Sequence, residues 1–449
     1  MEELRKLLQR LAGDILRAVN EGRAKGTLQP DYMRCFRWKV TEFEYGDKGI
    51  TKKSSTGEEF LKPFWSTNEV FQKVSKLKIY SEIYKAVSEH YNLGEGQVND
   101  YLHQLITRLA REYLEAKAKT VADVTKHVDS FLKDLNGEEQ ICGAKVQLRG
   151  LILQPNSIQL DGNVRLRKPN RKDFEIEEAA DFPPLRGGFL ESPTAFLHIG
   201  AYAKADTSSI VLRNEIDRAV AILRLFRVGA IQDIQYSQTT DSIIGMSRGT
   251  HTRGRLLGSA DRYLITRRDV KGLKSLWTSM KGVRLPGSAY PEPQQESDEL
   301  SIAYERYTDS LDTHLLEKRI SSAVMGLEAL YLGGVEQQEM SYRLRLRVSK
   351  LLSLIGYDPN EVQEGIRDSY EVRSKYVHGG ILHQKDKKKL ETKYGDLSQF
   401  SKKIMDYLRA SIVALLKRPS KTSLIRKIDD SFLNGKQEEE IKKLIFIPY

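Results

Sequence analysis

Apolar residues recur at helical spacing near the start of the chain. The first stripe consists of Leu4, Leu7, Leu8, Leu11, Ile15 and Val19. A second stripe follows the turn sequence NLGEG and consists of Val98, Leu102, Leu105, Leu109 and Tyr113. Apolar positions three and four residues apart lie on one face of an α-helix. The pattern therefore predicts an N-terminal helix and a second helical section over 67–135.

A different pattern lies between and after these helices. Residues 25–66 are aromatic and basic, with short strand-like pieces such as FRWKVTEFEYG. Alternating and β-branched runs occupy 141–210, separated by the turn sequences PNS and DGN, which favours strands. Helical spacing returns over 214–229, strand-like residues continue to 267, and a short helix is predicted over 268–281.

These patterns divide the chain into parts. We expect a mainly helical N-terminal region over 1–140 and a mixed α/β region over 141–283. Residues 284–299, RLPGSAYPEPQQESDE, are rich in proline, glycine and polar residues and predict a linker. The remaining residues, 300–449, predict an all-α bundle. The expected fold class is α+β.

Three signals support the helical bundle. A stripe from Leu316 to Tyr331 stops at two glycines, and another from Leu344 to Ile355 stops at Gly356. The sequence DPNE, 358–361, supplies an N-cap aspartate, a proline at the first helical position and a glutamate three after the cap. Two more helices are predicted near 396–417 and 421–434.

Composition narrows the class of protein. The chain has 72 Lys+Arg against 61 Asp+Glu, a formal net charge of +11, which favours a polyanionic partner. Its basic runs at 164–172 and 384–393 fit either solvated loops or phosphate contacts. The charged N-terminus and the lack of a long apolar run predict a cytoplasmic protein without a membrane span.

The cysteines and histidines indicate no metal site. Cys35 and Cys142 lie far apart in sequence and outside any cluster, so we expect two buried thiols. The histidines outside the segment described next show no metal-binding spacing. We expect no metal and no cofactor.

The segment RDSYEVRSKYVHGG, 367–380, places an arginine where a helix should be apolar. At about 100° per residue, the apolar face carries Val362, Ile366, Ser369, Tyr370, Val372, Tyr376 and Val377. The polar face carries Asp368, Glu371 and Lys375. Arg373 falls near the middle of the apolar face, where a charge is costly unless it is paired or functional.

The end of this segment suggests a chemistry. Ser374 and His378 lie one helical turn apart, and the glycines that follow end the helix. A histidine can move protons to and from ribose and leaving-group oxygens while an arginine holds the phosphate, so the pair suits RNA cleavage without a metal. Two alternatives stay open: Arg373 could simply pair with Glu328, and His378 could serve only as a helix cap.

Residues 316–380 resemble the Apea-like branch of the HEPN superfamily. The resemblance rests on GLEALYLGG, on YRLRLRVSKLLSLIG, and on a Tyr-x-x-Arg-Ser-x-x-Val-His-Gly signature. In this chain the signature residues are Tyr370, Arg373, Ser374, Val377, His378 and Gly379. The resemblance covers about the last 150 residues, and no motif of known chemistry precedes it.

The resemblance implies a HEPN bundle that dimerises and a metal-independent endoribonuclease with a composite site. Arg373 and His378 would be catalytic. The expected supporting residues are Ser374, Tyr370, Glu328 and Gly379. The expected RNA contacts are Lys375, Lys387, Lys388 and Lys389.

The expected partners follow from the same resemblance. They are RNA, with transfer RNA among the candidates, a second copy of the chain, and a phage-derived or other activating ligand of the N-terminal region. Such an enzyme would act as a toxin or an antiviral defence effector. The alternative is a non-catalytic HEPN module that binds proteins or nucleotides.

Overall fold

The computed structural model describes most of the chain. The described residues are 2–46, 49–179, 193–245, 248–252, 262–281, 283, 298–333, 339–416 and 420–446. Helices predominate and antiparallel strands form sheets, so the predicted α+β class is confirmed. The chain divides into two compact units that alternate along the sequence. Unit 1 contains 1–147, 169–212 and 235–252, and unit 2 contains 148–168, 213–234 and 253–449.

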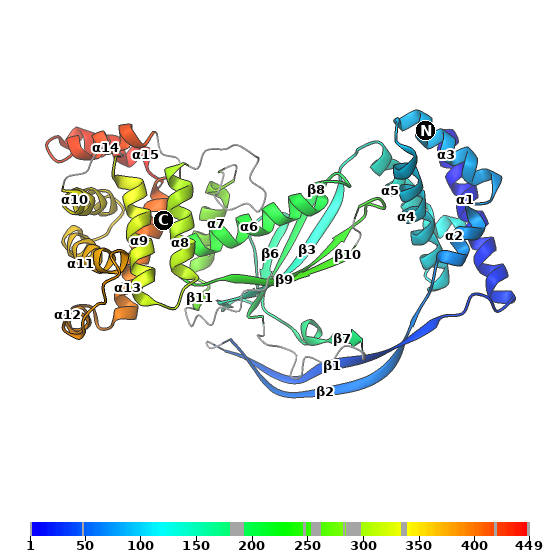
Figure 1. Cartoon of the computed structure of the whole chain (residues 1–449), viewed down its shortest axis with the longest axis horizontal. Coiled ribbons are helices and arrows are strands. Elements are labelled where there is room, and N and C mark those ends of the chain that lie inside the picture. The colour runs from blue at the N-terminus through cyan, green and yellow to red at the C-terminus, as the bar shows by residue number, and fades with distance from the viewer. Residues whose placement is uncertain are drawn as a thin grey trace. The chain divides into compact units, whose positions relative to one another are not determined.

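Five helices of unit 1 share one apolar core (Figure 1). They are α1 (Glu2–Ala24), α2 (Asn68–Val74), α3 (Lys78–Tyr91), α4 (Glu95–Leu114) and α5 (Val121–Leu135). The predicted stripes of α1 and α4 face this core: Leu8, Leu11 and Ile15 are fully buried, as are Leu102 and Leu105. The helices at both positions are confirmed.

The strands of unit 1 belong to two sheets. In one, the order is β2 (Gly49–Phe64), β1 (Asp31–Gly46) and β7 (Ile176–Ala179). In the other, consecutive strands are β10 (Arg248–Thr252), β9 (Gln232–Thr240), β3 (Gln140–Arg149) and β8 (Ala195–Ala203). The short strand-like pieces predicted over 25–66 are instead two antiparallel strands of 16 residues each, paired from Asp31↔Phe64 to Gly46↔Gly49.

Short strands and two helices precede the bundle. β4 (Leu151–Leu153) pairs in parallel with β11 (Tyr263–Ile265), and β5 (Ser157–Gln159) pairs antiparallel with β6 (Val164–Arg167). A 3₁₀ turn, η1, covers Arg171–Phe174, and the helices are α6 (Ser208–Phe226) and α7 (Asp269–Ser279). The predicted helices at 214–229 and 268–281 are therefore present with shifted ends.

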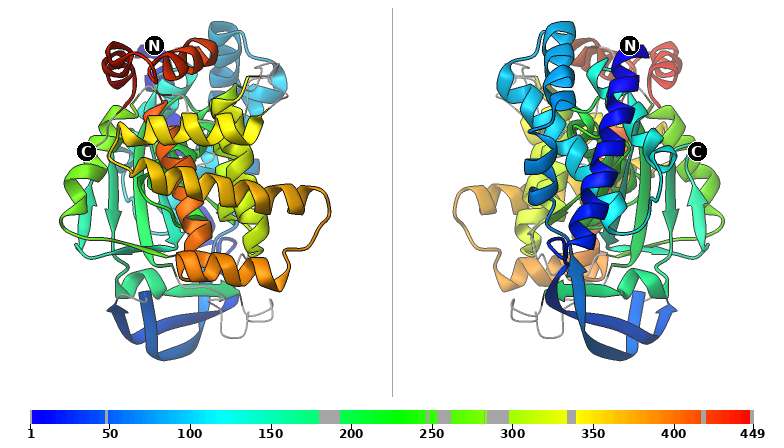
Figure 2. Two further views of the ribbon diagram at one scale, coloured as in Figure 1. Left: turned by 90° about the vertical axis from the view of Figure 1, so that its left-hand side faces the viewer. Right: turned by 90° about the vertical axis from the view of Figure 1, so that its right-hand side faces the viewer.

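The C-terminal part of unit 2 is all helical (Figure 2). Its helices are α8 (Glu299–Leu311), α9 (Leu316–Tyr331), α10 (Met340–Ser353), α11 (Pro359–Val377), α12 (Gln384–Tyr394), α13 (Leu397–Ala414), α14 (Lys421–Asp430) and α15 (Gly435–Leu444). α9 packs against α8, α11 and α13, and α10 packs against α11. All but two residues of the predicted linker lie outside the described part of the chain.

Two sequence interpretations of this bundle change. The basic run at 384–393, for which a solvated loop was one of two open alternatives, forms the helix α12, in which only Leu390 is buried. The predicted helix at 421–434 ends at Asp430, and a further helix, α15, follows it. α12 and α15 carry few apolar residues, so the helical spacing of apolar positions in their sequences is weak.

Both cysteines are buried and free, as predicted. Burial raises the pKa of the Cys142 thiol. Among the residues that the structure describes, every helix is too short or too polar to cross a lipid bilayer.

Candidate functional site

The helix that carries the signature, α11, begins as its sequence predicts. The Asp358 side chain accepts hydrogen bonds from the backbone N–H groups of Asn360 and Glu361, and Pro359 occupies the first turn. Further along, Gly365 lets α13 approach closely, because a Cβ there would lie 3.0 Å from the Tyr407 ring. The first half of α11 is therefore fixed by its cap and by close packing.

The faces of α11 differ from the prediction at two places. Asp368, expected on the polar face, is buried and accepts hydrogen bonds from Lys393 Nζ at 2.7 Å and Tyr394 Oη at 2.8 Å. Tyr376 and Val377, expected on the apolar face, are 39% and 49% exposed. α12 supplies these two partners of Asp368, and Arg367 of α11 is a third at 3.1 Å, whereas the apolar side chains at the end of α11 stay partly uncovered. The end of this helix therefore presents apolar side chains to solvent.

Arg373 is paired inside the bundle. Its Nη2 donates to Glu328 Oε2 of α9 at 3.1 Å, and its guanidinium lies 5.6 Å from the centre of the Tyr370 ring. Both charged side chains are mostly buried, with 21% and 16% of their area exposed. The pairing that the sequence left open as an alternative is present.

This ion pair is incomplete. Within the described part of the chain, Arg373 Nε and Glu328 Oε1 are buried and have no hydrogen-bond partner. A buried polar atom without a partner costs on the order of 1–3 kcal/mol, so such atoms call for an explanation.

The surroundings of this pair alter two pKa values. Burial raises the pKa of the Glu328 carboxyl above its usual 4.5, and the charge and hydrogen bond of Arg373 offset only part of that effect. Burial raises the pKa of Tyr370 as well, and the Glu328 charge adds to this increase. The environment thus disfavours negative charge beside Arg373 unless the guanidinium neutralises it.

His378 occupies the C-cap of α11. The N–H of Gly380 donates to the Lys375 carbonyl at 2.8 Å, and that of Gly379 donates to the Tyr376 carbonyl at 3.2 Å. These two bonds form a Schellman motif, and Gly379 has the left-handed φ of +73° that the motif requires. The backbone at His378 is therefore fixed.

The imidazole of His378 remains accessible. The residue is exposed, and its side chain forms no hydrogen bond with any described residue. The His378 N–H donates to the Ser374 carbonyl at 3.2 Å, as in any helical turn, and among the described residues no hydrogen bond joins the Ser374 hydroxyl to the imidazole. The histidine is positioned at the helix end without being engaged there.

The four lysines predicted to contact RNA fall into two classes. Lys375 is paired with Asp386 at 2.6 Å, and Lys387 is paired with Glu317 at 2.9 Å. Lys388 and Lys389 are exposed and form no ion pair within the described residues. Of the four lysines, only Lys388 and Lys389 can bind an external phosphate without first breaking an ion pair.

The structure thus brings Arg373, Glu328 and Tyr370 together, but no hydrogen bond joins them to His378. Among the described residues, no group of three or more His, Cys, Asp or Glu side chains is arranged to hold a metal ion. Within one chain, the arrangement offers a buried arginine that can bind an anion and a separate exposed histidine that can transfer a proton.

Comparison with known proteins adds no assignment. Protein-family models, curated proteins and solved structures all gave no significant match. The resemblance to Apea-like HEPN proteins therefore rests on the sequence motifs of 316–380 alone.

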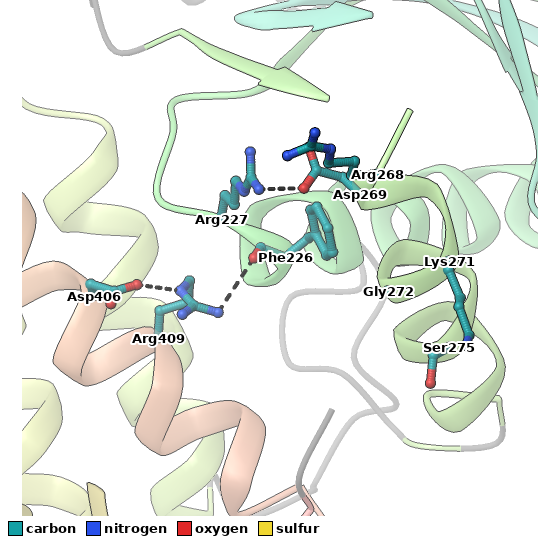
Figure 3. Close-up of a pocket in the computed structure, with 9 residues that line it drawn as sticks. All are labelled: Phe226, Arg227, Arg268, Asp269, Lys271, Gly272, Ser275, Asp406 and Arg409. Carbon is teal, nitrogen blue, oxygen red and sulfur yellow. Dashed lines mark hydrogen bonds and ion pairs between the residues drawn. The ribbon is translucent and has the colours of Figure 1, made fainter. Parts of the chain in front are cut away.

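Sequence reasoning missed a second candidate site in unit 2 (Figure 3). It is a pocket of about 740 Å³ that includes none of the signature residues. Its lining residues are Phe226, Arg227, Arg268, Asp269, Lys271, Gly272, Ser275, Asp406 and Arg409. They come from α6, α7 and α13 and the chain next to them, so no single stretch of sequence signals the pocket.

Proposed function

We propose that this protein is a metal-independent HEPN endoribonuclease that acts as a homodimer. The observation that carries the proposal is the incomplete pair of Arg373 and Glu328, with the arginine five residues before the exposed His378. A scissile phosphate would supply acceptor oxygens to the part of the Arg373 guanidinium that is exposed, since 21% of the side-chain area is accessible. This role explains why a costly charge occupies the packing face of α11.

The reaction needs two proton transfers. The ribose 2′-oxygen bonds to phosphorus as its proton leaves, and the bond from phosphorus to the 5′-oxygen breaks as that oxygen gains a proton. The products are a 2′,3′-cyclic phosphate and a 5′-hydroxyl end. His378 is assigned one or both transfers, and Arg373 stabilises the charge that develops on the phosphate.

A second copy of the chain would complete the site. His378 and Arg373 are not joined within one chain, and the exposed Tyr376 and Val377 beside them offer apolar surface for a partner helix. In the proposed dimer, residues from both copies surround one phosphate. The cellular role that goes with this activity is that of a toxin or defence effector in the cytoplasm, switched on through the N-terminal region.

The test is cleavage of transfer RNA and total RNA by the purified full chain in EDTA. We expect wild-type cleavage, and a loss of about 10²–10⁴-fold in both Arg373→Ala and His378→Ala. Two matched controls should retain activity: Arg367→Ala removes another paired arginine of α11, and His90→Ala removes an exposed histidine of α3.

The same samples distinguish the alternative function. The ion pair with Glu328 also suits a purely structural Arg373, as in a non-catalytic HEPN module. Equal cleavage by wild type and His378→Ala would indicate a contaminating nuclease and support the module. Light scattering adds a second readout: we expect a dimer that Val377→Lys weakens, and a monomeric wild type would contradict the composite site.

A further inference from the structure

The pocket in Figure 3 has an excess of positive charge. Its wall contains four basic side chains and two acidic ones, so two positive charges are not balanced within it. The basic residues are Arg227, Arg268, Lys271 and Arg409. A concave, positively charged wall concentrates anions at its surface.

Both acidic side chains already have cationic partners. Asp269 is paired with Arg227 at 2.5 Å, and Asp406 is paired with Arg409 at 2.7 Å. Burial raises the pKa of Asp269, but hydrogen bonds from Thr266 and the charge of Arg227 lower it overall, so this carboxylate stays ionised. The acids therefore neutralise the two arginines that face them and leave the other cations unbalanced.

The remaining cations, Arg268 and Lys271, are exposed and form no hydrogen bond or ion pair within the described residues. Arg268 is the N-cap of α7, and Lys271, Gly272 and Ser275 follow it at spacings of three and four residues along the same side of the helix. A guanidinium, an ammonium and a hydroxyl thus line one wall. Arg268 and Lys271 lie at the N-terminal turn of the helix, whose dipole also favours an anion, and Ser275 lies one turn further along.

The rest of the pocket gives little apolar contact. Phe226 is only 4% exposed, and the Arg227 guanidinium covers its ring at 5.6 Å from the centre. Arg409 donates to the carbonyl of Leu225 at 2.9 Å, which satisfies the last turn of α6. Recognition in this pocket must therefore depend on charge and hydrogen bonding more than on stacking.

We propose that this pocket binds a small molecule through a phosphate or diphosphate group, with Arg268, Lys271 and Ser275 as its donors. A phosphate offers several acceptor oxygens, which matches three donors on one wall. The volume of about 740 Å³ exceeds what a single phosphate fills and suits a molecule the size of a nucleotide. The site is separate from Arg373 and His378, so the proposal does not depend on the ribonuclease assignment.

Calorimetric titration of the full chain tests this site. The probes are pyrophosphate and ADP, with adenosine as the uncharged comparison. We expect both phosphate compounds to bind and adenosine not to bind. The double variant Arg268→Glu/Lys271→Glu should weaken binding by at least about tenfold, since it removes two charge-assisted hydrogen bonds and places two negative charges beside the phosphate.

A matched variant separates a site from general charge. Arg267→Glu/Lys274→Glu changes the net charge equally at two exposed residues that do not line the pocket, and should bind as the wild type does. Equal weakening in both variants, or no binding of pyrophosphate to the wild type at millimolar concentration, would overturn the proposal. Unchanged melting temperatures without ligand confirm that both variants are folded.

Two arms identify the source of the phosphate. RNA 10-mers with a 5′-phosphate or a 5′-hydroxyl compete against ADP. If neither oligonucleotide competes, the ligand is a free nucleotide-like molecule. If only the 5′-phosphorylated oligonucleotide competes, the same three donors bind the terminal phosphate of an RNA. Equal competition by both would mean that the pocket binds the RNA backbone without selecting a terminal phosphate, which contradicts the proposal.

Discussion

Arg347 and Arg373 both lie on packing faces of the helical bundle, yet their surroundings differ. Arg347 of α10 is 3% exposed and uses three nitrogens: Nε and Nη2 donate to Asp429, and Nη1 donates to the Tyr331 carbonyl. Arg373 of α11 has one hydrogen bond and one buried nitrogen without a partner. The comparison teaches that a buried charge alone says little. Arg347 has all three of its donor nitrogens engaged by the protein, whereas Arg373 has donor capacity left over.

The largest stability effect should come from the complete site. Arg347→Ala removes the bidentate pair with Asp429 and leaves the Tyr331 carbonyl buried without its partner, so we expect a loss of about 3–4 kcal/mol in the free energy of unfolding. Urea denaturation measures it. Asp429→Asn keeps the arginine and much of the hydrogen bonding, and should cost less. If Arg347→Ala costs less stability than Arg373→Ala, the comparison between the two arginines is wrong.

Substitution of Arg373, whose partners are incomplete, should lower the free energy of unfolding by less, and this loss should depend on pH. Arg373→Ala leaves Glu328 without its counter-ion, and we expect a loss of about 2 kcal/mol at pH 7.5. The folded-state pKa of Glu328 is already raised and rises further in this variant, so the protonated carboxyl stabilises the fold. That contribution is full below the unfolded value near 4.5 and disappears as pH rises through the folded value.

Urea denaturation at pH 7.5 and pH 4.5, each against wild type, checks this sign. The loss caused by Arg373→Ala should shrink at the lower pH. In the background of Glu328→Gln, the same substitution should show little pH dependence, because the titrating group is gone. A loss that grows at pH 4.5 would contradict the assigned direction.

The smallest effect concerns the end of α11. Gly379→Ala forces a residue with a Cβ into a left-handed conformation, which should cost about 1 kcal/mol. A Cβ there meets no other atom within 4 Å, so the cost is conformational. Gly435→Ala, in the first turn of α15, lacks both the positive φ and any contact and should be neutral or slightly stabilising.

Local signals allowed much of this bundle to be predicted. The DPNE sequence defined the start of α11, and its spacing placed Arg373 beside apolar residues and named Glu328 as a partner. The last turn was misjudged because periodicity identifies a face but not the point at which neighbouring helices stop covering it. Tyr376 and Val377 are exposed for that reason.

Elements that depend on distant residues were harder to predict. The 16-residue strands β1 and β2 stabilise each other by pairing along their whole length, which neither strand signals alone. α12 has one buried apolar residue and relies on pairs such as Lys387 with Glu317 and Lys393 with Asp368. The pocket requires Phe226, Lys271 and Arg409 to meet, and no spacing in the sequence encodes that meeting.

The Schellman motif that ends α11 also affects the conformational entropy of binding. Gly380 closes the backbone onto the Lys375 carbonyl, and the Lys375 side chain ties the same point to Asp386 at the start of α12. His378 therefore lies in a short segment that is held at both ends. A segment already ordered in this way loses little conformational freedom on binding, so more of the energy of contact with a partner or substrate appears as affinity.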